Sequence, residues 1–422
     1  MPRGARERLA KLLSDPTLAA LRGVLAEEKA RAWIVGGALR DVVLRRAVTE
    51  VDLAVDGDAG RIAKRMEALG RGRAVLLSGE RSPRVFRVAG RSRVLDLAEI
   101  EGGSIGADLS RRDFTANALA LDLVSGELLD PFGGLDDLDA KRLRLVAEKN
   151  LTDDPLRALR AARLLATHGL SPDRETSASC RRAAPAVARV ARERVQAELD
   201  KLLSAPRVVP ALAWAAGAGL FEPTLLRGVS ARRARGVAKA LAPFDKSTAA
   251  RLPAGRRRRL RLALLARRLG VRAAEAGAWL RALRWGNDEA SAVGRLLALA
   301  DRARKGPAGD DAWRWLLEAG DEASDGLLLL QASDPASRPI ARRLSALHRR
   351  RRPIPDVRGA DVLEWLGIPP GPEVGRLLEE VRVEALAGRV GTITEARDWL
   401  RRRNGPKSAR ERVSRGPESR RL

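Results

Sequence analysis

The chain has 422 residues, two to four times the length of a typical domain, so we expect several packed units. It carries 80 Lys and Arg against 54 Asp and Glu, a net charge of +26. This excess predicts a polyanionic partner, with nucleic acid as the first candidate and an Arg-rich genome composition as the alternative. One cysteine and two distant histidines, His168 and His348, exclude an internal disulfide, a cysteine-cluster zinc site and a paired-histidine metal motif.

The charged start of the chain lacks an apolar signal segment, and the longest apolar runs are too short to span a bilayer. We therefore expect a soluble cytoplasmic protein with no membrane association. Nothing in the sequence predicts an obligate protein partner.

In chain order, a helical segment over residues 1–30 precedes a region, 31–147, in which short strand-like runs alternate with helical stretches. The runs are 32–35, 51–55, 75–77, 85–88, 94–97 and 119–124. From residue 148 strand patterns nearly vanish, while Leu, Ala and Arg recur at helical spacing. The fold class is therefore α+β, with helical units at 148–203, 204–335 and 336–400 and a disordered basic tail at 401–422.

The first chemical motif is a Gly36-Gly37 pair between an apolar strand and a helical segment that contains Arg40. Two glycines permit close backbone approach, and the start of a helix offers unpaired N–H groups to phosphate. A triphosphate cradle fits this pattern, but taken alone the junction is equally a tight turn.

The second motif is an acidic strand in which side-chain alternation places Glu50 and Asp52 on one face. Two carboxylates beside a phosphate-binding turn can hold Mg²⁺ ions that activate a 3′-hydroxyl and neutralise a transferring phosphate. Asp96, in a later strand-like run, is a candidate third ligand. The alternative is a solvent-exposed edge strand.

Further along, Arg112 is a candidate ligand of triphosphate oxygens through charge-assisted bonds. Asp113 or Asn117 can hydrogen-bond a ribose hydroxyl. The following Asp-Pro-Phe-Gly-Gly segment, 130–134, is interpreted as a structural turn.

The last motif begins the helical region, where Asp154 suits an N-cap and Pro155 a first helical position. A helix start on local grounds alone is one interpretation. The other is a reader of bases: the Asp154 carboxylate accepts from the amine shared by C and A, and Arg157 donates to C N3 or A N1. Arg160 and Arg163 follow at intervals of three and predict a groove wall that reaches toward phosphates.

Together these motifs resemble those of the class II tRNA nucleotidyltransferases, the CCA-adding enzymes and bacterial poly(A) polymerases of the DNA polymerase β superfamily. The resemblance rests on Gly-Gly-x-x-Arg-Asp at 36–41, the acidic strand, Arg-Arg-Asp-Phe-Thr-x-Asn at 111–117 and Asp-Pro-Phe-Gly-Gly. It also includes Asp-x-x-Arg-x-x-Arg-x-x-Arg at 154–163, Arg-Glu-Arg-Val-x-x-Glu-Leu at 192–199, and a C-terminal pattern over 359–378.

This resemblance implies a polymerase-β-like catalytic head over 31–147, then a neck with a nucleotide-selecting helix, a body and a tail that grip the acceptor arm of tRNA. It implies CTP and ATP as substrates and Mg²⁺ as cofactor, with Glu50 and Asp52 on metal. Gly37, Arg40, Arg112, Asp154, Arg157, Arg160 and Arg163 would bind the nucleotide.

The sequence departs from the family at two acids and one segment. The metal strand of the family usually begins with Asp, and the extra methylene of Glu50 displaces its carboxylate by roughly 1.5 Å. Asp153 stands where Glu is usual, and the stretch between Asp96 and Arg111 is short. The product therefore stays open between CCA, CC, A and poly(A), and a catalytically impaired RNA-binding homologue is the alternative of another class.

A run of four arginines at 256–259 precedes an apolar helical stretch. It either grips RNA phosphates or forms a solvated helix edge.

Overall fold

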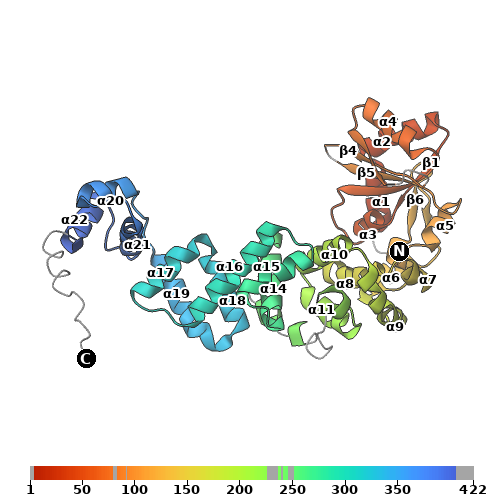
Figure 1. Cartoon of the computed structure of the whole chain (residues 1–422). Helices are drawn as coiled ribbons and strands as arrows, with labels where there is room; N and C mark the ends of the chain where they lie inside the picture. Colours follow the sequence, from red (N-terminus) through yellow and green to blue (C-terminus); the bar gives the residue numbers. More distant parts are fainter. Residues whose placement is uncertain are drawn as a thin grey trace. The chain divides into compact units, whose positions relative to one another are not determined.

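The computed structural model describes residues 4–78, 83–91, 93–225, 236–238, 241–245 and 251–404. The chain forms two compact units, residues 1–242 and residues 243–422, and the boundary falls inside the segment predicted as the body. The first unit contains a β-sheet with helices, and the described part of the second is helical (Figure 1). The predicted α+β class, a mixed sheet followed by a helical region, is confirmed.

In the described part of the first unit, seven strands form one sheet in the order β3-β4-β5-β2-β1-β6-β7. Only β2 and β5 pair in parallel, and the other neighbours are antiparallel. All six strand-like runs of the sequence fall on strands of this sheet. The strands are β1 Arg31–Val35, β2 Glu50–Asp56, β3 Arg73–Ser78, β4 Val85–Ala89, β5 Val94–Glu99, β6 Ala120–Asp122 and β7 Leu128–Leu129, and a separate parallel pair joins β8 Arg142–Leu143 to β9 Ser171–Pro172.

The central strand β2 has the alternation that the sequence predicted. Val51 and Leu53 are buried, while Glu50 and Asp52 are exposed. Such alternation arises because successive side chains of a strand point to opposite faces. The register pairs Asp52 with Val35 of β1 and with Asp96 of β5, so the acidic end of β2 lies beside the end of β1.

Helices cover the sheet and continue beyond it. The helix α4 packs on β3, β4 and β5, and α2 packs on α4. Local sequence explains their ends: α2 starts at Pro16 behind the capping carboxylate of Asp15, and α8 stops at Gly169, whose φ is +71°. These helices are α1 Ala5–Leu13, α2 Pro16–Glu27, α3 Gly37–Val43, α4 Ala59–Ala68, α5 Ile105–Ser110, η1 Thr115–Asn117 and α6 Gly134–Asp139.

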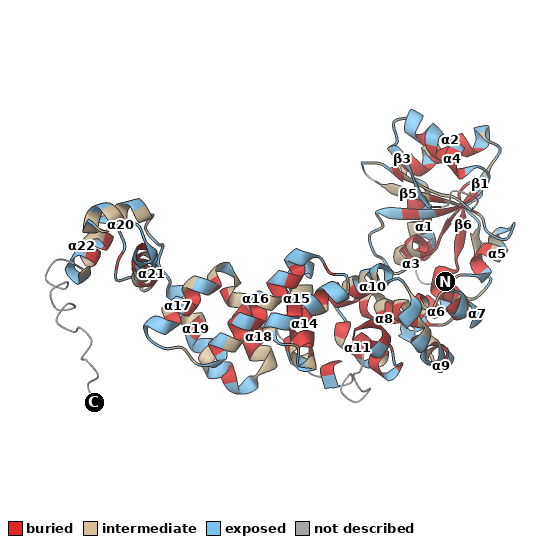
Figure 2. Ribbon diagram, viewed as in Figure 1, coloured by how far each residue is buried: buried red, intermediate tan, exposed pale blue. Residues whose placement is uncertain are grey.

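Most of the remaining helices of the first unit contact α8, whose buried face meets α10 and α11 (Figure 2). Ala158, Ala161 and Ala162 lie on this face, and their small side chains let the helices approach closely. The helices are α7 Lys149–Asp153, α8 Leu156–His168, α9 Arg174–Ala183, η2 Ala184–Arg189, α10 Arg192–Ser204, α11 Val208–Gly217 and α12 Phe221–Thr224.

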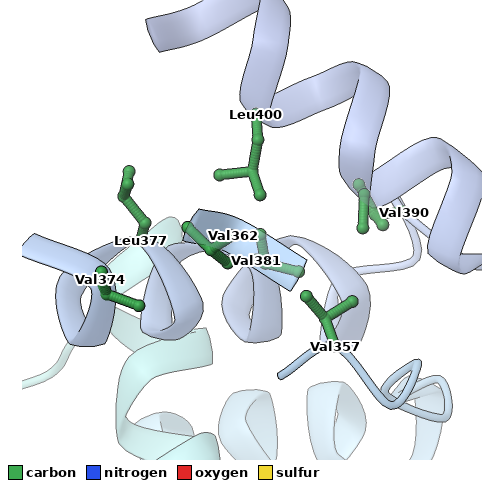
Figure 3. Packing of buried hydrophobic residues seen from close by; sticks show 8 residues of the cluster. Val357, Val362, Val374, Leu377, Val381, Val390 and Leu400 are labelled. Carbon is green, nitrogen blue, oxygen red and sulfur yellow. The ribbon is translucent and has the colours of Figure 1, made fainter. Parts of the chain in front are cut away.

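The second unit contains helices with their own apolar core near its end, where side chains of α20, α21 and α22 and of the adjoining loops pack together (Figure 3). This core is formed by Val357, Val362, Val374, Leu377, Val381, Val390, Ala396 and Leu400. The helices are α14 Ala254–Leu269, α15 Ala273–Ala282, α16 Asn287–Arg304, α17 Asp310–Ala319, η4 Gly320–Glu322, α18 Ala323–Ser333, η5 Pro335–Ser337, α19 Arg338–Arg350, α20 Gly359–Leu366, α21 Pro372–Leu386 and α22 Ile393–Asn404.

The second unit contains two basic segments, the arginine run at 256–259 and the tail predicted at 401–422. The arginine run at 256–259 is engaged by acids: Arg256 pairs with Asp325, and Arg258 and Arg259 pair with Glu289. The predicted basic tail begins inside α22, which runs through Asn404, and residues 405–422 lie outside the described part of the chain. Within the described ranges, no helix is both long and apolar enough to cross a lipid bilayer.

Candidate active site

A cavity of about 350 Å³ opens in the first unit between the start of α3, the acidic strand β2, η1 and the helix α8. Six arginines and two aspartates line it, so its wall is strongly positive. Such a wall favours a polyanionic ligand of the size of a triphosphate. The lining residues are Gly36, Gly37, Arg40, Asp52, Arg111, Arg112, Asp113, Asn117, Arg157, Arg160 and Arg163.

The glycine turn lets the backbone form one side of this cavity. Gly36 has φ +70° and ψ −129°, a conformation that side chains rarely adopt. A Cβ atom there would lie 2.8 Å from Nη1 of Arg112 and 3.8 Å from Oδ2 of Asp52. The turn therefore requires glycine for two reasons, and it brings a bare backbone next to both charged groups.

Three carboxylates were predicted to bind metal: Glu50, Asp52 and Asp96. Of these, only Asp52 lines the cavity. Although the Asp52 side chain is open to the cavity, the protein around its carboxylate displaces bulk water and raises its pKa, and the negative charges of Asp96 and Glu50 raise it further, against the pull of Arg112. Concentrated negative charge of this kind is relieved by a bound cation. Glu50 lies two residues away on the same exposed face of β2.

Asp96 is bound by an arginine that the sequence did not single out. Arg87 of β4 lies directly across from Asp96 in the register and donates from Nε and Nη2 to its two carboxylate oxygens at 2.8 and 2.7 Å. The hydrogen bonds to Asp96 hold the pKa of Arg87 above its ordinary value. Asp96 therefore makes a bidentate pair with Arg87, and no group of three or more His, Cys, Asp or Glu is arranged for a metal among the residues that the structure describes.

The predicted ribose-binding residues form the back of the cavity and are linked to one another. Asn117 accepts from Nη1 of Arg40 at 2.6 Å and donates to Asp113 at 2.8 Å. Asp113 is buried, and it also accepts from the backbone N–H of Phe114 and from Arg160 at 3.2 Å. Burial alone would raise the pKa of Asp113, but the charge of Arg160 and these hydrogen bonds lower it, so it is a carboxylate that orders its neighbours.

Two further arginines are held from behind by a buried acid. Asp108 of α5 accepts from Nε and Nη2 of Arg112 at 3.2 and 2.8 Å and also pairs with Arg111. Sequence reasoning missed Asp108, although its position four residues before Arg112 on a helical turn is a signal for such a pair. Arg157 donates to the carbonyl of Arg111 at 2.6 Å, which ties α8 to this side of the cavity.

Glu198 of α10 plays the same part for the other two arginines of α8. Its Oε2 accepts from Nε of Arg163 at 2.6 Å, and Oε1 lies 3.5 Å from Nε of Arg160. Glu198 is only 7% exposed, so its charge is screened little by water. The sequence contained this residue in a recognised motif but gave it no role.

The predicted base reader is divided between two cavities. Arg157 lines the nucleotide-sized cavity, whereas Asp154 lines a neighbouring one of about 620 Å³ and accepts from Arg194 at 2.8 Å. The predicted N-cap is one residue off, because α8 begins at Leu156 with Pro155 as its N-cap; Asp154 accepts from the N–H of Leu156 at 3.3 Å from the position before it. Glu50, Asp96 and Asp154 are thus the predicted site residues that do not line the main cavity, and Arg111 is a lining residue that was not predicted.

Comparison with known proteins places these features in context. The family model described as "Poly A polymerase head domain" matches residues 32–101 and 84–144, which hold the glycine turn, the acidic strand and Arg112. A second model, described as "Probable RNA and SrmB- binding site of polymerase A", matches residues 169–230.

The chain is also similar to tRNA nucleotidyltransferases along most of its length. The chain is 30% identical over 382 residues to a CC-adding tRNA nucleotidyltransferase of Synechocystis sp., covering 87% of this chain and 92% of that protein. It is 30% identical over 400 residues to a CCA-adding enzyme of Geobacillus stearothermophilus, covering 88% and 93%. The crystal structure of the Bacillus stearothermophilus CCA-adding enzyme in complex with CTP has a TM-score of 0.72 at 27% identity, covering 94% of this chain and all of that one.

Proposed function

Because the chain belongs to the family of nucleotidyltransferases that contains the CCA-adding enzymes and the bacterial poly(A) polymerases, we propose that it adds CMP and AMP to the 3′ end of tRNA. CTP and ATP are the proposed substrates, and the proposed product is a tRNA with a newly added or repaired CCA end. The observation that carries this proposal is the cavity in which arginines of α3, of the turn after α5 and of α8 converge beside Asp52.

The arginines would bind and orient the triphosphate. Arg40, Arg112 and Arg160 each have an acidic or amide partner behind them, which fixes the guanidinium while leaving N–H groups for a ligand. Guanidinium groups form charge-assisted bonds with phosphate oxygens, and several together restrict the ligand to one orientation. The glycine turn at Gly36 and Gly37 leaves room for a phosphate next to the backbone.

Glu50 and Asp52 would hold the divalent cations, Mg²⁺ in our proposal. Their common exposed face on β2 and the raised pKa of Asp52 fit such a role, because a cation would relieve the crowding of negative charge. Bound Mg²⁺ would supply charge neutralisation at the transferring phosphate and activation of the 3′-hydroxyl. Asp96, the third candidate ligand, is paired with Arg87, so we assign Asp96 to positioning of β5 and the cations to Glu50 and Asp52.

Base selection is assigned to Asp154 and Arg157. A carboxylate accepts from the exocyclic amine of C and A, and a guanidinium donates to C N3 or A N1, whereas G and U offer the reverse patterns. For this role Asp154 would exchange its bond with Arg194 for the amine of the base.

For the RNA, we propose a contact surface on α19 of the second unit. Arg338, Arg342 and Arg349 are exposed and fall within about 40° on one face of the helix, over roughly 16 Å of its length. None of the three forms a hydrogen bond or ion pair with any residue in the described part of the chain. Unpaired arginines in a row fit the phosphates of a nucleic-acid backbone.

Two other products of the same chemistry are alternatives: a poly(A) tail, or partial addition of CC or A. The similar proteins include both CC-adding and CCA-adding enzymes, so relatedness does not select one product. A protein that binds tRNA without catalysis is the alternative of another class, and Glu50 is the observation that favours it.

The test is incubation of the purified protein with Mg²⁺ and tRNA transcripts that end before CCA, after C or after CC. Labelled CTP, ATP, GTP and UTP are supplied separately and together. Addition of two C and one A supports the proposal, addition of C alone or A alone indicates a partial enzyme, and long A tails indicate a poly(A) polymerase. Tight tRNA binding without incorporation of any nucleotide would overturn the catalytic proposal.

A further inference from the structure

The last residue of α8, His168, contacts the helix that carries Arg40. Nε2 of His168 lies 2.8 Å from Oδ1 of Asp41, and the same oxygen accepts from Nε of Arg40 at 3.0 Å. The His168 side chain is only 6% exposed. Neither His168 nor Asp41 lines the nucleotide-sized cavity, so both lie behind the residues proposed to touch the nucleotide.

This contact is part of a series of hydrogen bonds that starts and ends on α8. From Asp41 the series passes to Arg40, then to Asn117 at 2.6 Å, Asp113 at 2.8 Å and Arg160 at 3.2 Å. Arg160 and His168 are both on α8, eight residues or about 12 Å apart along its axis. The helix therefore closes the ring, and two positions of α8, Arg160 and His168, are linked to Arg40 through hydrogen bonds.

The polar hydrogens around His168 explain why a histidine suits this place. The hydroxyl of Thr167 lies 2.7 Å from the carbonyl of Arg163 and 2.6 Å from Nδ1 of His168, and the tautomer of the ring decides which of them receives its one proton. Nε2 donates to the Asp41 carboxylate, because an ionised carboxylate can only accept.

The charged groups that face His168 are Asp41 and Arg40 of α3 and Arg46 just after it. Burial lowers the pKa of His168, Asp41 raises it, and Arg40 and Arg46 lower it. When the ring is neutral, the tautomer with a proton on Nε2 still donates to Asp41. The bond to Asp41 therefore persists in both protonation states, and a donor at the Nε2 position is the property that matters.

Arg40 depends on this support because its own side chain is buried and held at two points. Its Nε donates to Asp41 and its Nη1 to Asn117, while the rest of the guanidinium meets the cavity next to Gly37. We infer that His168 is a positioning residue for nucleotide binding: it holds Asp41 in the orientation that aims Arg40 at the triphosphate. The inference rests on the proposed function, since it assumes that Arg40 binds a nucleotide.

The test compares His168→Leu, which has no donor, with His168→Gln, whose amide can donate near the position of Nε2. His348→Gln is the matched control, because His348 is the other histidine of the chain and lies on α19. Binding of CTP is measured by calorimetry, and KM for CTP and kcat are measured with a tRNA that lacks its CCA end. We expect His168→Leu to weaken CTP binding and raise KM about tenfold with kcat changed less than about twofold. His168→Gln and the control should stay within about twofold of the wild type.

Equal effects of Leu and Gln, or no effect of Leu on either constant, would overturn the inference. If His168→Leu does not fold, the comparison of His168→Asn with His168→Gln takes its place, because the shorter amide cannot reach Asp41. Failure of the proposed function is seen separately, as absence of CTP binding and nucleotide addition in the wild-type protein. CTP binding that is the same in wild type and His168→Asn rejects only the role of His168.

Discussion

The clearest energetic prediction concerns Glu198, the buried carboxylate behind Arg160 and Arg163. Replacing it with Gln keeps the size of the side chain and one acceptor oxygen but removes the charge. The Arg163 side chain is 15% exposed and that of Arg160 is 32% exposed, so both guanidinium groups would lose their partner in a poorly solvated place. Burial already lowers the pKa of Arg163, and Glu198 is the main group that opposes this.

Removing one partner of a buried ion pair costs about 3–5 kcal/mol, because the remaining charge is left uncompensated. Gln still accepts a hydrogen bond from Arg163, and Arg160 keeps its contact with Asp113, so the lower part of this range applies. We expect Glu198→Gln to lower the free energy of unfolding by about 3 kcal/mol. We also expect KM for CTP to rise by at least about tenfold, since two arginines of the cavity lose their orientation.

Thermal and urea unfolding of the two proteins would measure the first effect, and steady-state kinetics the second. The matched control is Glu175→Gln, an exposed glutamate on α9 of the same unit, which should change stability by less than about 0.5 kcal/mol. If Glu198→Gln behaved like this control in both assays, the reasoning about the buried charge would be refuted.

Three further predictions follow from the carboxylates and from α19. Glu50→Asp should raise kcat by roughly tenfold if the extra methylene misplaces the carboxylate, and an unchanged or lower rate in the addition assay would show that the site is adapted to Glu. Asp52→Asn should abolish addition yet stabilise the metal-free protein at pH 7, because a raised pKa means that the ionised form of Asp52 destabilises the fold. This gain should fade in urea melts as the pH falls through the folded pKa, and should vanish below the unfolded value of about 3.8. Changing Arg338, Arg342 and Arg349 together to Gln should reduce the slope of log K for tRNA binding against log salt concentration by about two to three. The same change at the ion-paired Arg256, Arg258 and Arg259 should leave this slope unchanged.

Much of the fold could be predicted because the patterns are local. Alternating apolar residues placed β2 at the right residues, and the position of Gly36 after an apolar strand identified the turn before α3. The order of strands in the sheet was not predictable in the same way, since it depends on pairings such as Asp52 with Asp96 between segments more than 40 residues apart. The division into two units at residue 242 also left no clear sign in the composition.

For the site, the sequence identified side chains better than it identified their partners. Arg40, Arg112 and Arg160 line one cavity as expected from their motifs. The third carboxylate, Asp96, was predicted from its position on a strand, but its bond with Arg87 depends on the register between β4 and β5. Asp154 was predicted to cap a helix beginning at Pro155, but α8 begins at Leu156 with Pro155 as its N-cap, and the pairing of Asp154 with Arg194 of α10 is a tertiary contact.

These hidden partners have a common physical reason. The positive guanidinium groups that line the cavity repel one another. Without nearby negative charges, this repulsion and the loss of hydration would destabilise the folded state. Asp108 and Glu198 pair with the arginines from outside the cavity lining, and Asp113, which lines the cavity, pairs with Arg160, so these acids offset the repulsion between the arginines. Each acid also uses up donors, which leaves every guanidinium with a limited and directed set of N–H groups. The arrangement accounts for both stability and selectivity: the acids make the folded cavity possible, and the donors they leave free fix how a triphosphate can lie in it.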